Sequence, residues 1–155
     1  MLLEQKVARK LIELRKTLSL AESCTGGLLS HRLTNIPGSS QFLLFSIIAY
    51  SNMAKSKFLG VPKALIKTHG AVSGPVAEAM AKGARKALKS DFAISLTGIA
   101  GPTGGTKAKP VGLVFISLSS HKETVSYKLL FKGSREAIKQ QATDEALKLF
   151  LNRLV

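Results

Sequence analysis

The chain has 155 residues, of which 45% are hydrophobic and 21% charged, a composition typical of one globular domain and unlike disordered or fibrous chains. Its 23 Lys and Arg against 9 Asp and Glu give a formal charge of +14, which favours an anionic partner and makes nucleic acid the first to consider. The single cysteine, Cys24, excludes an internal disulfide. The sequence has no signal-peptide pattern and no apolar run near the roughly 18 residues of a membrane helix. We therefore expect a cytoplasmic protein without membrane contact.

Helical and extended patterns alternate along the first half of the chain. Residues 2–16 carry apolar side chains at helical spacing and basic ones elsewhere, which predicts an amphipathic helix. Residues 41–50 are apolar and rich in aromatic side chains, which predicts a buried strand. The other expected elements are a strand over 17–21, a helix over 26–34, and short helices over 51–57 and 61–67.

The second half predicts one long helix, three strands and a final helix. Ser73 has the position of an N-cap and Pro75 falls in the first turn of the helix that follows. Residues 92–96 form a strand, and residues 111–118 and 124–131 form two strands close enough for an antiparallel hairpin. A last helix opens at residues 133–136. We therefore expect one α/β domain over residues 1–155 with a mixed sheet.

Two segments of small residues carry the first functional signal. Residues 21–27 and 97–105 each follow an apolar run and combine glycine with hydroxylated side chains. Small residues at the carboxyl ends of strands allow a ligand to approach the backbone closely, and packing does not readily explain either segment. We expect the two segments to form two walls of one pocket, with Ser23 as its nucleophile.

No recognisable sequence pattern identifies a histidine as the base that would activate Ser23. There is no G-x-S-x-G sequence and no order of acid and histidine typical of a serine triad. Zinc-binding spacings such as HExxH or CxxC are also missing, so we expect no metal and no cofactor. The three histidines, which we expect to be structural or exposed, are His31, His69 and His121.

Lysine is the alternative base. Tyr50 stands at the end of a predicted strand, and Lys55 lies about one turn into the next helix. A lysine acts as a base only if burial or neighbouring positive charge lowers its pKa towards neutrality. Cys24 is a rival nucleophile because a thiolate at a helix start is activated, but we favour Ser23.

Two features suit a phosphate group. The turn at residues 37–40 offers backbone N–H groups and two hydroxyls. Arg135, near the start of the last helix, has a guanidinium that can bind two oxygens at once. Either feature alone is weak, since most such turns and surface arginines bind nothing.

Seven short segments occur in a fixed order along the chain: 21–27, 37–40, 50–55, 59–62, 70–73, 97–105 and 109–112. Together they closely resemble the CinA C-terminal domain family, the nicotinamide mononucleotide amidases of the pyridine-nucleotide cycle. The resemblance runs from about residue 4 to residue 152, and an ordered set of this kind is far more specific than one motif.

The resemblance implies a three-layer α/β fold, with a central mixed sheet flanked by helices, and a homo-oligomer, most simply a dimer. It also implies hydrolysis of nicotinamide mononucleotide to nicotinate mononucleotide and ammonia without a metal, in pyridine-nucleotide recycling. Ser23 would be the nucleophile and would form a catalytic group with Tyr50 and Lys55, a proton passing to Lys55 directly or through Tyr50. The substrate-binding residues that the resemblance and the residue types assign are Gly38, Ser39 and Ser40 for the phosphate, Thr97, Gly98, Ala100 and Gly101 for the nicotinamide end, and Arg135.

Some alternatives stay open at this point. Lys139 stands where family members often carry a second arginine, and a lysine keeps the charge without the bidentate geometry. The domain is expected to stand alone, whereas in many bacteria it is fused behind another nucleotide-processing domain. A non-catalytic module of the same fold, binding a nucleotide or protein in competence or DNA repair, is the second hypothesis. Specific nucleic-acid binding is a weaker third, since the basic residues are dispersed and aromatic residues are only 6%.

Overall fold

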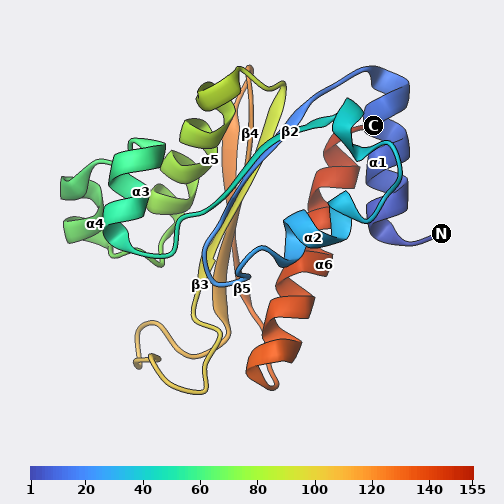
Figure 1. The fold of residues 1–155 in the computed structure, drawn as a ribbon. Helices are drawn as coiled ribbons and strands as arrows, with labels where there is room; N and C mark the ends of the chain where they lie inside the picture. The colour runs from blue at the N-terminus through green and yellow to red at the C-terminus, as the bar shows by residue number, and fades with distance from the viewer.

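The computed structural model describes residues 1–155, which fold into three layers around a five-stranded sheet (Figure 1). The strand order is β2–β1–β3–β4–β5, with the first three strands parallel and the last two antiparallel to their neighbours in turn. The mixed sheet expected from the sequence is therefore confirmed. The strands are β1 (Leu18–Glu22), β2 (Leu43–Ile48), β3 (Phe92–Gly98), β4 (Leu113–Ser120) and β5 (Thr124–Leu130).

Helices cover both faces of the sheet, three on each side (Figure 1). One layer contains α1 (Leu3–Leu14), α2 (Leu28–Thr34) and α6 (Arg135–Arg153). The other contains α3 (Asn52–Leu59), α4 (Lys63–His69) and α5 (Gly74–Leu88). A short 3₁₀ turn, η1 (Ser39–Gln41), leads into β2.

Serine side chains start three of the helices. The Ser73 hydroxyl accepts from the Val76 N–H at the start of α5, as its position in the sequence predicts, and Pro75 lies in the first turn. Ser51 caps α3 and Ser134 caps α6 in the same way. Each bond satisfies one of the backbone donors that a helix leaves free at its amino end.

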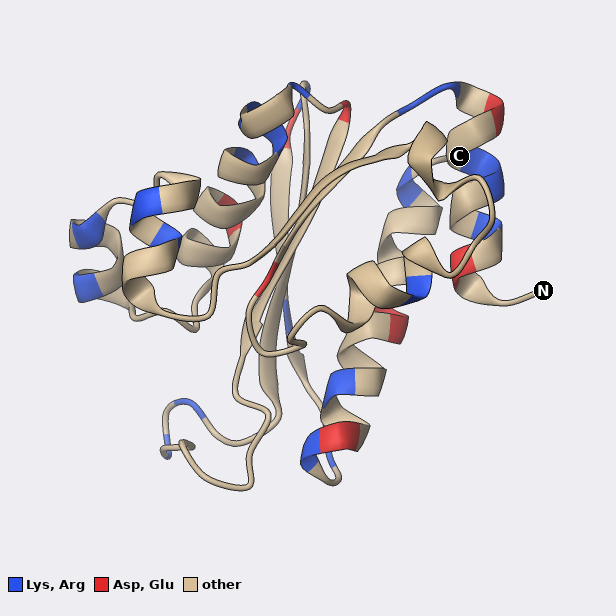
Figure 2. Cartoon of the chain, in the orientation of Figure 1, with Lys and Arg blue, Asp and Glu red and all other residues tan.

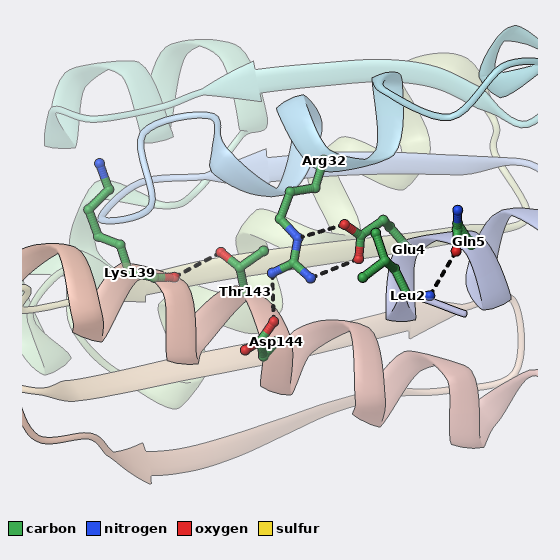
Figure 3. A network of polar contacts seen from close by, with 7 residues as sticks. All are labelled: Leu2, Glu4, Gln5, Arg32, Lys139, Thr143 and Asp144. Atoms are coloured by element: carbon green, nitrogen blue, oxygen red, sulfur yellow. Dashed lines mark hydrogen bonds and ion pairs between the residues drawn. The ribbon is translucent and has the colours of Figure 1, made fainter.

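One guanidinium group links the three helices of the layer formed by α1, α2 and α6, as Figure 3 shows. Arg32 on α2 donates to both carboxylate oxygens of Glu4 on α1, at 2.8 and 3.2 Å, and to Asp144 on α6 at 2.6 Å. Its hydrogen bonds hold the pKa of the Glu4 carboxyl below its usual value. Charged groups at the edge of the core are thus paired, as burial of charge requires.

The strand β2 differs from the expectation that it would be buried. It pairs with β1 alone and forms one edge of the sheet. Its side chains alternate between partly buried and exposed, with Leu44 41% and Ile48 51% exposed. An apolar run therefore marks an edge strand here, which hydrophobicity alone does not distinguish from a central one.

Candidate active site

A cavity of about 270 Å³ lies where β1 and β3 end. The two strands are parallel neighbours, so their carboxyl ends meet at the same edge of the sheet. The Ser23 N–H donates to the Leu96 carbonyl at 3.1 Å, which joins the first small-residue segment to the residue just before the second. Of the residues singled out in the sequence, the cavity is lined by Ser23, Cys24, Tyr50, Lys55, Thr97, Gly98, Ala100, Gly101 and Arg135.

Lys55 and Ser23 are in direct contact at the base of this cavity. The Lys55 Nζ lies 3.2 Å from the Ser23 Oγ, 2.9 Å from the Ala49 carbonyl oxygen and 3.0 Å from the Tyr50 carbonyl oxygen. Lys55 is only 1% exposed. None of the ion pairs of the structure includes it. A buried amine without a carboxylate is rare in a core and typical of a reactive group.

Burial lowers the pKa of the Lys55 amine from its usual value because desolvation disfavours the charged form. A neutral amine has two N–H groups and one lone pair. Two carbonyl oxygens, from Ala49 and Tyr50, and one hydroxyl, from Ser23, surround it. The carbonyls can take the two N–H donors, which leaves the lone pair to accept the proton of the Ser23 hydroxyl.

Glu22 fixes the position of the turn that carries Ser23. Its fully buried carboxylate accepts from the N–H groups of Leu29 and Ser30, at 3.0 and 2.9 Å, and from the Thr25 hydroxyl at 2.6 Å. It thereby ties the end of β1 to the first turn of α2 across the turn between them. Glu22 is not among the site residues expected from the sequence, although an acidic residue just before a helix start can indicate such a contact.

Cys24 is a poor nucleophile in this environment. Its side chain is buried, and burial raises the pKa of the thiol to about 12. The thiolate is the reactive form of cysteine, so a thiol with this pKa is protonated and inert at neutral pH. The geometry thus favours Ser23 over its neighbour.

The backbone carbonyl and the side-chain hydroxyl of Tyr50 make different contacts. Its backbone carbonyl accepts from Lys55, whereas its hydroxyl accepts from Arg135 Nη2 at 3.2 Å and its side chain is 61% exposed. Arg135 Nη1 also donates to the Gly101 carbonyl at 2.6 Å. The sequence left open whether the Ser23 proton passes to Lys55 directly or through Tyr50. In the structure, Lys55 contacts Ser23 directly. The Tyr50 hydroxyl lies at the rim of the cavity with Arg135.

The glycines of the second wall do have a packing explanation, contrary to the expectation from the sequence. A Cβ on Gly98 would lie 2.7 Å from the Leu113 carbonyl oxygen, and Gly101 has a φ of +75° and faces the Val111 side chain. Thr97 donates its hydroxyl to the Ala71 carbonyl at 2.9 Å. Close contact with neighbouring segments therefore explains the small residues of this wall.

The turn at Gly38, Ser39 and Ser40 is not part of this cavity. It precedes β2, whose first residue pairs with Leu18 at the start of β1, whereas Ser23 follows the end of β1. The turn and the nucleophile of one chain are thus at opposite ends of the sheet. Within one copy, the structure brings together every predicted site residue except these three.

Other features of the site bear on its chemistry. The backbone N–H groups of Cys24 and Thr25, which directly follow Ser23, donate to no backbone carbonyl. No group of three or more His, Cys, Asp or Glu side chains is arranged to hold a metal ion.

None of the helices has the length and apolar character required to cross a bilayer.

Fold and site together define a single-domain α/β protein with a serine–lysine pair at the carboxyl ends of two parallel strands. The family model of the CinA C-terminal domain matches residues 2–154, and the chain belongs to this family. Among solved structures, the competence/damage inducible protein CihA from Agrobacterium tumefaciens is 36% identical, with a TM-score of 0.93 over 97% of this chain and 93% of that one. A CinA superfamily protein from Klebsiella pneumoniae is 32% identical, with a TM-score of 0.95 over 98% and 95%.

Curated relatives are longer than this chain. A CinA-like protein of Syntrophus aciditrophicus is 49% identical over 97% of the chain, which corresponds to 36% of the relative. One from Endomicrobium trichonymphae is 47% identical over 95% of the chain and 34% of the relative. The chain thus spans about a third of the length of these relatives.

Proposed function

We propose that this domain is an amidohydrolase that converts nicotinamide mononucleotide to nicotinate mononucleotide and ammonia, with Ser23 as nucleophile and Lys55 as general base. The observation that carries the proposal is the buried Lys55 amine, 3.2 Å from the Ser23 hydroxyl, without an acidic partner. The substrate comes from the resemblance of the ordered motifs to nicotinamide mononucleotide amidases. The names of the relatives do not include this activity.

In the proposed reaction, neutral Lys55 takes the proton of Ser23 as the Oγ attacks the carboxamide carbon. The tetrahedral oxyanion forms beside the free N–H group of Cys24, which lines the cavity and can donate to it. Protonated Lys55 then delivers its proton to the departing nitrogen, so that the C–N bond breaks and ammonia leaves. Water attacks the resulting ester, with Lys55 again as base, and releases the carboxylate product and Ser23.

The cavity suits a ligand of this class in its charge distribution. Thr97 and Ala100 line the same cavity as Ser23, and in the proposed complex they contact the pyridine ring. Arg135, which is exposed at the rim, carries a positive charge for the phosphate end of the substrate. Its present partners are neutral oxygens of Tyr50 and Gly101, which a phosphate can replace.

The test is release of ammonia from nicotinamide mononucleotide by the wild type and by Ser23→Ala. We expect the variant to lose about 10³-fold or more of kcat while its melting temperature stays close to that of the wild type. Cys24→Ala is the matched control for the neighbouring nucleophile and is expected to retain turnover within about tenfold. Unchanged turnover in Ser23→Ala would rule out the serine mechanism.

The second candidate is a non-catalytic binding module of the same fold. It is favoured by the names of the relatives, such as the competence/damage inducible protein from Agrobacterium tumefaciens. Against it is the energetic cost of burying Lys55 without a counter-ion, since a binding module needs no such group. Absence of ammonia release by the wild type, together with retained mononucleotide binding, would favour this second candidate.

A further inference from the structure

The loop between β3 and β4, residues 99–112, forms part of the wall of the Ser23 cavity. Its residues Thr103 and Gly104 line the cavity. Figure 1 shows the loop projecting beyond the end of β3. Residues 102–108 are all exposed, so burial does little to hold this part of the loop in place. Its position at the cavity therefore depends on a few specific contacts.

The base of the loop is fixed to the sheet. The Ile99 N–H donates to the Leu113 carbonyl at 2.9 Å, and the Gly112 N–H donates to the Ile99 carbonyl at 2.8 Å. Farther out, Thr106 and Lys109 close a turn of their own. The Thr106 N–H donates to the Lys109 carbonyl at 2.8 Å, and the Lys109 N–H donates to the Thr106 hydroxyl at 3.0 Å. These last two bonds shape the turn but attach it to no other element.

One side chain attaches the outer part of the loop to another element. The Lys109 Nζ donates at 2.5 Å to the carbonyl oxygen of His69, the last residue of α4. This is the only hydrogen bond between residues 102–109 and a helix or strand. None of the ion pairs of the structure includes Lys109. A lysine is suited to this place because the last carbonyls of a helix lack partners and attract positive charge.

Gly70, which ends α4, makes room for the lysine. Its φ is +79°, and a Cβ at this position would lie 2.6 Å from the Lys109 Nζ. Glycine thus serves both the backbone conformation and the close approach of the amine. The next two residues, Ala71 and Val72, line the cavity. Lys109 therefore joins two parts of the cavity wall, the loop after β3 and the segment after α4.

The segment after α4 is held in place without Lys109. The Thr97 hydroxyl donates to the Ala71 carbonyl at 2.9 Å, and the Ser73 hydroxyl donates to the Gly70 carbonyl at 2.8 Å. The outer part of the loop has no such second contact. Loss of the lysine side chain would therefore free the loop and leave the segment after α4 where it is.

We propose that Lys109 is a positioning residue, a tether that holds the outer part of the loop against the Ser23 cavity. None of residues 102–109 hydrogen-bonds to Ser23 or Lys55. The tether therefore acts on the binding of the ligand and not on the chemical step. Its effect on the substrate rests on the proposed function, whereas the attachment of the loop to α4 does not.

The attachment is tested by limited digestion of the native protein with trypsin. The loop contains two lysines and no arginine, and the bond after Lys109 precedes Pro110, where trypsin does not cleave. Cleavage between Lys107 and Ala108 thus reports on the loop in the wild type and in Lys109→Met alike. We expect mass spectrometry to show this cleavage at least about tenfold faster in Lys109→Met, because proteolysis follows the population of the open form.

Lys67→Met is the matched control for this digestion. It removes one charge from an exposed position on α4 and should leave cleavage after Lys107 at the wild-type rate. Equal rates in the wild type and in Lys109→Met overturn the proposal. Faster cleavage of Lys109→Met at lysines outside the loop as well would show global unfolding, and would also overturn it.

The effect on the substrate is tested by the kinetics of ammonia release. We expect Lys109→Met to raise KM for nicotinamide mononucleotide about tenfold while kcat stays within about threefold, since a loosened wall weakens binding of substrate and transition state alike. Lys107→Met removes the same charge from an exposed position in the same loop and should keep the wild-type KM. An unchanged KM in Lys109→Met, or a loss of kcat alone, overturns this role of the tether.

The tether and the amidase fail in different ways. A wild type that releases no ammonia contradicts the amidase, while digestion still decides whether Lys109 attaches the loop. The effect on binding is then decided by calorimetry with nicotinate mononucleotide. Equal affinity in the wild type and in Lys109→Met overturns it, whereas weaker binding in Lys109→Met, with Lys107→Met unchanged, supports it.

Discussion

At the scale of single residues, the protonation state of Lys55 decides whether Ser23 can react. Burial lowers the pKa of this amine from 10.5, so the neutral form that accepts a proton appears at a lower pH than in an exposed lysine. We expect kcat/KM for ammonia release to rise with pH and to level off above this lowered pKa. The midpoint of the profile, measured from about pH 5 to 10, should lie below 10.5.

Two variants separate this role of Lys55 from a structural one. Lys55→Met should remove activity and the titration together, whereas Lys67→Met, at an exposed position on α4, should leave the profile unchanged. A midpoint at or above the ordinary lysine value, or a profile that persists in Lys55→Met, would show that another group is the base.

The residues of the site could be recognised from the sequence to different extents. The types of Ser23, Tyr50 and Lys55 and their order are visible in the sequence, and so is Arg135. Their distances are not, because these residues come from separate elements that only the sheet brings together. The sequence could not show that the Tyr50 carbonyl, and not its hydroxyl, contacts Lys55, since backbone contacts leave no trace in residue type. Glu22 was missed for a related reason: its role appears only when Leu29 and Ser30 turn their N–H groups towards it.

At the scale of elements, the contact among α1, α2 and α6 depends on the Glu4 carboxylate. Glu4 lies largely buried against Arg32, and the pKa of its carboxyl is lowered by that contact (Figure 3). A lowered carboxyl pKa means that the folded state prefers the charged form, so its stabilisation is present above about pH 4.5 and is lost as pH falls through the folded pKa. Glu4→Gln should therefore lower the free energy of unfolding at pH 7 by about 1–3 kcal/mol.

Chemical denaturation at several pH values tests this expectation. The difference between the wild type and Glu4→Gln should shrink as the pH falls below about 4.5. Glu13→Gln is the control, because Glu13 pairs with Arg9 on the exposed side of the same helix, and such pairs contribute about 0–1 kcal/mol. A constant difference at all pH values would contradict a charge-dependent contact.

Most of the helices and strands could be predicted from the sequence, whereas the order of the strands in the sheet could not. Each predicted helix and strand is present, since periodicity and serine caps are local signals, as at Ser73 before α5. The place of β1 between β2 and β3 is set by contacts far apart in the sequence. For this reason an apolar run at residues 41–50 appeared to be a buried strand and is in fact an edge.

At the scale of the whole molecule, the charge of +14 has a distribution that argues against specific binding of nucleic acid. Figure 2 shows Lys and Arg over helices on both sides of the sheet and over the loop after β3. Dispersed charges attract phosphates without fixing a register, and such binding depends on release of counter-ions.

We therefore expect duplex DNA to bind weakly, without sequence preference, and to be released by salt. Fluorescence anisotropy with two unrelated duplexes should give equal affinities at about 50 mM salt, and a loss of about 10³-fold by about 200 mM if several phosphates are contacted. Nicotinate mononucleotide should not compete, because Lys55 and Arg135 are the only basic residues that line the cavity at Ser23. Affinity that persists at the higher salt concentration, or that differs between the duplexes, would mean that part of this surface is a genuine nucleic-acid site. The excess of lysine would then have a function of its own.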